Sequence, residues 1–297
     1  MSSWLLGLEL QRQKSLKKSK IALLIIVFLA IILCILNYFL VKDYDPPGFF
    51  ILIFMASVTL YSYLNARFTK NIRADFKEYV IPEILKEIEP NLSYQRQNFI
   101  DQNEFFATEI FSTDYSKYSG NDLIVGKAED VLVKFSDILI KKEIQNDKQK
   151  DEIVVFCGIC FIAKFNKKIK ATTQVIDKMA KFSFGSGEKA VMDDILFEKY
   201  FRTYTHDQVV ARYLVTPKFM QNLCKLKELF KAPVCAVFMG ENLYLYIDLR
   251  RDSFELDMKK PIDIDSLNAY KSEVQIFIDI VKVLNLNDDL FVVSQDD

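Results

Sequence analysis

The sequence predicts an α+β protein, in which an N-terminal transmembrane helical hairpin is followed by a mainly antiparallel β-sheet domain with packed helices. Three observations predict this fold. Apolar residues are concentrated in two long runs before residue 65. Several segments between residues 121 and 247 have the short, apolar, often alternating pattern of strands, and helical spacing recurs before and after them. Hydrophobic residues make up 51% of the chain and charged residues 27%, a globular rather than a disordered balance.

The first apolar run covers residues 21–41 and contains no charged residue. At a rise of about 1.5 Å per residue, about 20 helical residues cross a hydrocarbon core about 30 Å thick. A signal peptide has a shorter apolar region, about 7–15 residues, and ends in a small-residue cleavage site that residues 37–40 do not offer. A buried core helix would show a polar face. We therefore expect a retained membrane span.

The second apolar run covers residues 49–64 and reaches about 18 residues when it is counted from Pro47. Between the two runs, Pro46, Pro47 and Gly48 prevent a helix from continuing, so the chain is expected to turn there. The two runs predict a transmembrane hairpin over residues 21–64.

The charges that flank the hairpin predict its orientation. Basic residues precede the first span and follow the second, whereas the connecting loop carries one lysine and two aspartates. Because basic residues favour the cytoplasmic side, both termini are expected to be cytoplasmic. The flanking basic residues are Arg12, Lys14, Lys17, Lys18, Lys20, Arg67, Lys70 and Arg73.

Residues 1–20 allow two interpretations. Ser3 can cap a short helix that places Trp4, Leu5 and Leu8 on one face, as in a segment that lies in the lipid interface. The alternative is an unstructured basic cytoplasmic tail that only sets the topology, since chain termini are often poorly ordered.

Residues 65–115 are expected to form a helical stalk. Residues 66–89 have helical spacing and continue from the second span. Pro82 is expected to kink this helix or to start a new one, and Pro90 to end it. Residues 99–112 show the pattern of a further amphipathic helix.

Residues 116–297 are expected to form the soluble α+β domain. Residues 123–126, 131–140, 152–165 and 167–175 read as strands of an antiparallel meander, with a polar connection at 144–150 and a turn at 166–168. Residues 196–205 fit either a helix or a strand, and residues 182–187 read as a flexible loop.

The last third of the domain combines helices with a hairpin signal. Thr216 is expected to cap a helix that has Pro217 in its first turn. Residues 240–242 separate two apolar strands as a hairpin turn would. Asp265 is expected to cap the last helix.

No cofactor or metal site is predicted. Cys157 and Cys160 match the C-x-x-C pattern, but they lie in a predicted strand, where residues i and i+3 face opposite sides. A zinc site would need further ligands from a chain with one histidine. The five cysteines do not form a disulfide framework, and reduced thiols agree with a cytosolic location.

One group of residues is a possible functional cluster, although no catalytic residue is assigned. It consists of Glu198, His206, Asp207 and Arg212. A histidine can act as a general base. However, no serine or cysteine lies in the context of an activated nucleophile, and neighbours in sequence do not define catalytic geometry.

Other charged and glycine-rich segments predict no nucleic-acid or nucleotide binding. Residues 185–189 lack the spacing of a phosphate-binding loop. Lys167, Lys168 and Lys170 form a basic patch too small for nucleic acid, though suited to lipid headgroups. The net charge of −1 gives no global attraction to polyanions.

A block of aromatic and polar residues resembles a bacterial family of two-span membrane proteins known only as a domain of unknown function. The residues that carry the resemblance are Phe197, Glu198, Phe201, Asp207, Ala211, Arg212, Tyr213, Thr216, Pro217, Phe219 and Met220, preceded by Phe156, Gly158, Cys160 (where the family usually has Phe), residues 165–167 and Thr172. The resemblance implies the architecture and a location in the bacterial inner membrane. It implies no activity, cofactor or catalytic residue.

Two functions of different classes are therefore expected. The first is a non-enzymatic binding or scaffold module, anchored in the inner membrane and facing the cytoplasm, whose expected partners are the lipid bilayer and a protein. The alternative is a membrane-associated hydrolase that uses carboxylates and His206. A channel or transporter subunit is disfavoured, because one hairpin without intramembrane charge offers no pathway.

Overall fold

The computed structural model describes residues 3–40, 46–128, 130–146, 149–181 and 183–284. The chain divides into two compact units. Unit 1 combines residues 1–81 with residues 255–271, and unit 2 combines residues 82–254 with residues 272–297.

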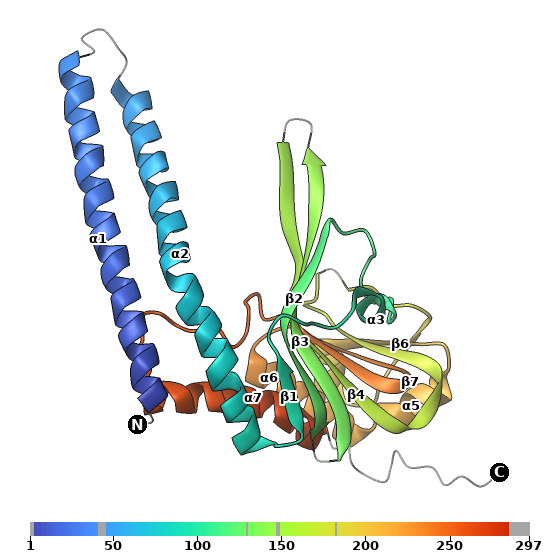
Figure 1. The fold of residues 1–297 in the computed structure, drawn as a ribbon. Coiled ribbons are helices and arrows are strands. Elements are labelled where there is room, and N and C mark those ends of the chain that lie inside the picture. Colours follow the sequence, from blue (N-terminus) through green and yellow to red (C-terminus); the bar gives the residue numbers. More distant parts are fainter. Residues whose placement is uncertain (1–2, 41–45, 129, 147–148, 182, 285–297) are drawn as a thin grey trace. The chain divides into compact units, whose positions relative to one another are not determined.

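Unit 1 contains the predicted hairpin helices. Helices α1 (Ser3–Leu40) and α2 (Pro46–Ile88, whose last turns belong to unit 2) are both long and apolar enough to cross a membrane (Figure 1). Their apolar side chains are largely exposed, with Leu24 and Phe54 each 70% accessible. Because a soluble protein rarely exposes so large an apolar surface, lipid is expected to cover it. Residues 41–45 lie outside the described part of the predicted turn.

The predicted tail is helical from Ser3 onward and is continuous with the first span. Leu5 and Leu8 are buried. Arg12 forms a 2.7 Å ion pair with Glu9 and donates a 2.9 Å hydrogen bond to a main-chain carbonyl in the 255–271 segment of the same unit. Of the two interpretations, the helical one therefore describes this backbone.

Helix α2 continues from the second span, as predicted, and ends at Ile88, so it forms only the first part of the segment predicted as a stalk. Pro82 lies inside this helix, so no new helix starts there. Ser19 of α1 donates a 2.6 Å hydrogen bond to Asn65 of α2. Lys77, near the end of the α2 segment that belongs to unit 1, forms a 2.7 Å ion pair with Glu255. These contacts hold the two helices and the 255–271 segment in one unit.

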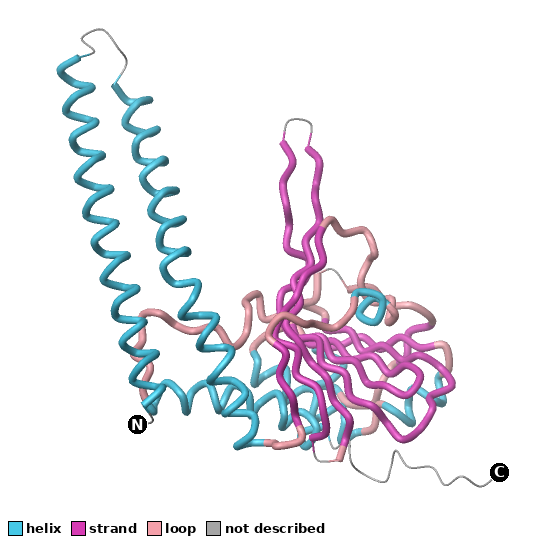
Figure 2. The backbone as a smooth tube through the Cα atoms, viewed as in Figure 1, coloured by secondary structure: helices cyan, strands magenta, loops and turns pink. Residues whose placement is uncertain are grey.

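Unit 2 is built on a seven-stranded sheet of antiparallel pairs in the order β1-β2-β3-β4-β6-β5, with β7 also paired to β4. Figure 2 shows the strands in magenta. The predicted fold class, an α+β protein with an antiparallel sheet, is confirmed. The strands are β1 (Leu92–Gln95), β2 (Lys117–Ala128), β3 (Val131–Asn146), β4 (Gln149–Asp177), β5 (Glu188–Ala190), β6 (Phe201–Thr205) and β7 (Val234–Ile247). The helices are α3 (Gln102–Phe106), α4 (Ile195–Tyr200), α5 (Gln208–Leu214), α6 (Pro217–Phe230) and α7 (Ile264–Leu284), whose first turns belong to unit 1.

Two predicted turns are wrong, and they lie opposite each other. Strand β4 runs through residues 166–168, and β7 runs through residues 240–242. The two strands pair on both sides of these positions, and the register between them shifts around the pair formed by Ile169 and Gly240. Gly240 has a φ of +63°, which only glycine adopts readily. The turn residues therefore form facing irregularities in two long strands rather than two hairpins.

Three helix predictions also need correction. The helix expected at 99–112 is only α3, which ends after five residues and leads into an irregular segment. Residues 196–205, which fitted either a helix or a strand, contain one of each: they begin within α4, and β6 follows directly. Asp265 lies inside the first turn of α7, where the carboxylate of Asp263 instead accepts from the Ser266 N–H. Thr216 caps α6 through the Phe219 N–H, as predicted.

The sheet has an apolar core on each face. On one face, Phe105 of α3 is fully buried and packs edge-on against Phe156 of β4 and Tyr246 of β7. On the other face, Phe277 of α7 packs against Phe135 of β3. Both faces are therefore covered, which explains why β4 and β7 read as nearly continuous apolar runs.

Replacing Phe105 with alanine is expected to destabilise unit 2 by about 3–5 kcal/mol, because a fully buried ring leaves a cavity among its aromatic neighbours. Phe184 is 58% exposed, so Phe184→Ala is the matched control and should cost less than about 1 kcal/mol. Thermal unfolding of the detergent-solubilised chain measures both. Equal losses for the two variants would contradict this account of the core.

Candidate functional site

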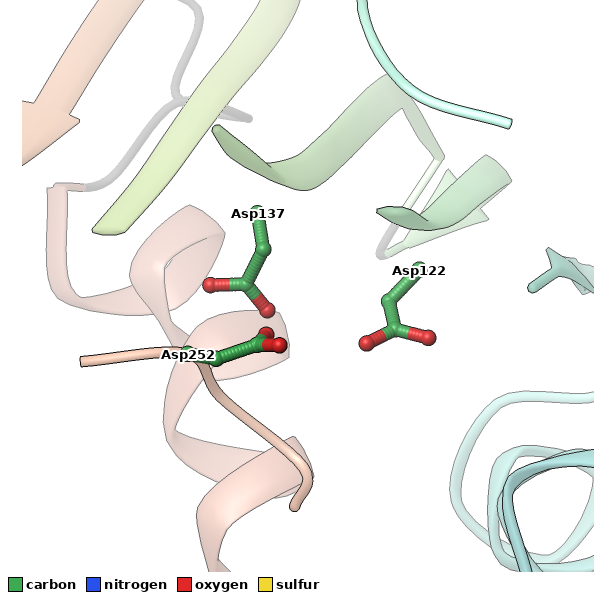
Figure 3. A group of neighbouring side chains, drawn as sticks. All are labelled: Asp122, Asp137 and Asp252. Atoms are coloured by element: carbon green, nitrogen blue, oxygen red, sulfur yellow. The ribbon is translucent and has the colours of Figure 1, made fainter. Parts of the chain in front are cut away.

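Three carboxylates from distant parts of the chain converge in unit 2 (Figure 3). Asp122 lies in β2, Asp137 in β3 and Asp252 in the segment between β7 and α7. One oxygen atom from each lies within 4.8 Å of the others. We call these three residues the carboxylate cluster.

The sheet positions two members of the cluster through an irregular pairing of β2 and β3. Asn121 pairs with Asp137, and the register then shifts before Ile124 pairs with Phe135. Asp122 lies in this shift with a φ of +59°, in the left-handed region that aspartate tolerates better than most residues. The bulge places the Asp122 carboxylate near that of Asp137.

Hydrogen bonds hold the carboxylates in place. The Tyr94 hydroxyl donates to Asp122 Oδ1 at 2.5 Å. The Asn121 amide donates to Asp122 Oδ2 at 3.1 Å and to Asp252 Oδ2 at 3.3 Å. The Ser253 main-chain N–H donates to Asp137 Oδ2 at 3.1 Å. These donors orient the cluster from β1, β2 and the segment that carries Asp252.

Asp137 is the most constrained member. It is only 3% exposed, and its Oδ1 atom has no hydrogen-bond partner. Burial raises the pKa of Asp137 well above its usual range, and the nearby carboxylates of Asp252 and Asp122 raise the pKa further. The site therefore has affinity for a positive charge, which a proton or an oxygen-binding cation can supply.

Sequence reasoning missed this cluster. Asp252 lies more than a hundred residues after Asp122 and Asp137, so no local spacing joins the three. The available signal was Asp137 itself, a carboxylate in the middle of an apolar strand, where a charged residue is costly unless it is paired or functional.

The four residues of the predicted cluster have separate local contacts. Asp207 caps α5 through the Val209 and Val210 N–H groups, and Glu198 accepts from the Met192 N–H at 2.9 Å. The described hydrogen bonds and ion pairs join no two of the four side chains Glu198, His206, Asp207 and Arg212. His206 and Arg212 are exposed. The geometry gives these residues roles as caps and surface groups.

The elements that carry these residues also expose large apolar side chains. Strand β5 is an edge of the sheet and pairs with β6, which connects α4 to α5. Gln208 of α5 donates a 3.4 Å hydrogen bond to the carbonyl of Lys189 in β5. We call the exposed apolar side chains of α4 and α5, together with Val191 directly after β5, the β5-edge surface, which consists of Val191, Ile195, Leu196, Val209 and Tyr213.

The C-x-x-C pattern is structural in this fold. Cys160 is buried in the apolar core on the α3 face, whereas strand alternation directs Cys157 to the opposite face. Burial raises the pKa of both thiols, and Asp137 and Asp252 raise the pKa of Cys157 further. Between them, a side chain on Gly158 would lie 2.1 Å from the carbonyl oxygen of Ile247, so glycine is required for the two backbones to approach.

The structure thus defines a class of protein with two helices able to span a membrane and an α+β domain built on an antiparallel sheet. Residues 154–286 match the model of the family described as "Protein of unknown function (DUF3137)". This match covers β4 to α7 and confirms the resemblance to a family of unknown function. No curated protein matches the chain.

A solved structure that resembles this chain is the crystal structure of the mycobacterial trehalose monomycolate transport factor A, TtfA. The likeness covers 70% of this chain and 96% of that chain, with 8% sequence identity and a TM-score of 0.38. A likeness this distant does not define the function of this chain.

The raised pKa of Asp137 predicts a pH-dependent stability in chelator-containing buffer. The native state holds the Asp137 proton at pH values where the unfolded chain, with a carboxyl pKa of 3.8, has released it. The free energy of unfolding should therefore fall as pH rises from the unfolded pKa towards the folded one. Asp137→Asn has no ionisable group at this position and does not lose stability in this way. The Tm of the variant minus the Tm of the unsubstituted chain should therefore be larger at about pH 8 than at about pH 5. An equal difference at both pH values would contradict the assignment.

Proposed function

We propose that this chain is a membrane-anchored binding or scaffold module at the bacterial inner membrane, whose α+β domain faces the cytoplasm and binds a protein partner. Residues 21–64 serve as the anchor, and the part of α2 that follows them serves as the stalk. Within the range 65–115 that was expected to form the stalk, β1 and α3 pack with the domain of residues 116–297, which is the proposed binding domain. The observation that carries the proposal is the β5-edge surface, an apolar surface exposed on a domain that the same chain tethers to lipid.

The β5-edge surface has the properties of a protein-binding site. Ile195 is 88% exposed and Val209 is 78% exposed, although both lie in helices next to a sheet edge. Exposed apolar groups beside a strand edge are typical of interaction surfaces, because a partner can cover the side chains and pair with the free strand edge. The surface therefore offers both apolar contact and main-chain recognition.

Charge favours a protein partner over the membrane face. Residues 188–213 carry five acidic residues and four basic ones, so this region has no cationic excess. Binding to an anionic leaflet depends on basic clusters, each lysine or arginine contributing about 1 kcal/mol. A mixed-charge rim around apolar side chains instead resembles the polar rim of a protein interface.

The structure gives no support to the hydrolase alternative. A hydrolase needs a base within hydrogen-bond reach of a nucleophile or a bound water, together with a group that orients it. Glu198 and Asp207 are instead occupied by main-chain N–H groups, and His206 is exposed in the turn that precedes α5.

The proposed orientation is tested with a reporter enzyme that is active only outside the cytoplasm, fused after Asp297. We expect no activity there, because the basic residues around the hairpin keep both termini on the cytoplasmic side. The same reporter placed in the loop at Asp45 should be active. Activity at the C-terminus and none at the loop would overturn the orientation.

Binding through the β5-edge surface is tested with Ile195→Asp and Val209→Asp in the full-length chain, by quantitative pull-down from detergent-solubilised membranes of the source bacterium. Both residues are highly exposed, so the fold should persist. Each new carboxylate buried in an apolar interface should weaken the binding free energy by about 2 kcal/mol or more, which is at least a tenfold loss of affinity. The proteins that depend on this surface are those lost with both variants.

Leu132→Asp is the matched control, because Leu132 is 50% exposed at the start of β3, outside the β5-edge surface. It should retain the partner at the level of the unsubstituted chain. If the control and the two surface variants recover the same proteins in the same amounts, the β5-edge surface is not the binding site.

A further inference from the structure

We propose that the carboxylate cluster of Asp122, Asp137 and Asp252 binds a hard divalent cation, such as Ca²⁺ or Mg²⁺, within unit 2. The inference is independent of the β5-edge surface, which lies on other residues, so either proposal can fail alone.

The geometry of the cluster suits a hard cation. Ca²⁺ takes six to eight oxygen ligands at about 2.3–2.6 Å, so two opposite ligands lie about 5 Å apart. The three carboxylate oxygens, all within 4.8 Å of one another, fit around one such ion. Figure 3 shows the side chains of Asp137 and Asp252 directed towards each other, with Asp122 facing them across a gap.

A second observation points to a ligand. Asp137 Oδ1 and Ser253 Oγ are buried polar atoms without a hydrogen-bond partner, and the two residues are in direct contact through the Ser253 N–H. Buried polar atoms are nearly always paired, because an unpaired one costs about 1–3 kcal/mol. A cation in the cluster gives the buried Asp137 oxygen a partner as a metal ligand.

The surroundings supply the other parts of a metal site. Tyr94 and Asn121 donate to the carboxylates and fix their orientation, which is the usual task of groups behind the ligands. Asp252 is exposed, so an ion can enter from its side and keep water molecules as its remaining ligands. The bulge that holds Asp122 at a positive φ brings the third carboxylate to a position that a regular strand would not reach.

The competing arrangement is a proton on Asp137 shared with Asp252, without any metal. Asp137→Asn distinguishes the two, because asparagine has the shape of the protonated acid and removes one anionic ligand. The variant therefore keeps the shape of the buried acid in either case, and it retains cation affinity only if the cluster is not the site.

The experiment is isothermal titration calorimetry of the full-length chain in detergent, after removal of chelator, with CaCl₂ and separately with MgCl₂. We expect one equivalent of at least one ion to bind, and binding to be about tenfold weaker or more in Asp137→Asn and in Asp252→Asn. Asp193→Asn, which removes an exposed carboxylate outside the cluster, should bind as the unsubstituted chain does. The Tm should rise by about 5 °C at a hundredfold excess of ion over Kd.

The proposal is overturned if neither ion binds the unsubstituted chain, or if Asp137→Asn and Asp252→Asn bind as tightly as Asp193→Asn. Should Asp137→Asn fail to fold, as judged by circular dichroism, Asp252→Asn decides, because its side chain is exposed and its removal leaves the buried part of the sheet intact. Equal weakening in all three variants would show only diffuse charge attraction and would also overturn it.

Discussion

Strand β4 is the constraint on which the rest of unit 2 depends. It is 29 residues long and pairs with β3, β6 and β7, so three separate parts of the chain are aligned along one backbone. Its residues alternate between the two apolar cores, with Phe156 on the α3 face and Phe161 against Phe135 on the α7 face. Because both faces are buried, a register slip by one residue would exchange every side chain between the cores. The register in turn places Asp137 of β3 opposite Ile159 of β4. It also places β6, and the edge strand β5 beside it, at the C-terminal end of β4.

The elements that the sequence predicted well are those in which local signals and tertiary packing agree. The two apolar runs specify helices in any apolar solvent, and the Thr216–Pro217 start of α6 satisfies its first N–H groups by itself. The turn signals at 166–168 and 240–242 failed because turn propensity is local, whereas pairing of β4 with β7 is not. Each strand offers the other a partner across the irregular positions, and the hydrogen bonds gained on both sides outweigh two local turn preferences.

The two candidate sites differ in the same way, because one is formed by local contacts and the other by tertiary structure. Glu198 and Asp207 drew attention because they are carboxylates near a histidine, yet their acceptor groups bind main-chain N–H groups within a few residues, which is the commonest use of such side chains near helix starts. The carboxylate cluster, in contrast, exists only after β2, β3 and the segment beyond β7 meet. Asp252 lies within the part of the chain that matches the family model, and Asp122 and Asp137 precede it. No property of a single segment could have joined these three residues.

Two energetic costs coincide at the carboxylate cluster. A left-handed backbone at Asp122 costs on the order of 1 kcal/mol, and a buried carboxyl at Asp137 costs more than a hydrophobic residue of similar size. Neither cost is needed to close the sheet, because β2 and β3 pair regularly on both sides of the shift. A fold selected for stability alone would have a regular ladder and an apolar side chain here. A strained backbone at Asp122 beside a buried acid at Asp137 is instead what a preorganised ligand site requires, because the free energy of binding an ion would offset the stability that the empty site lacks.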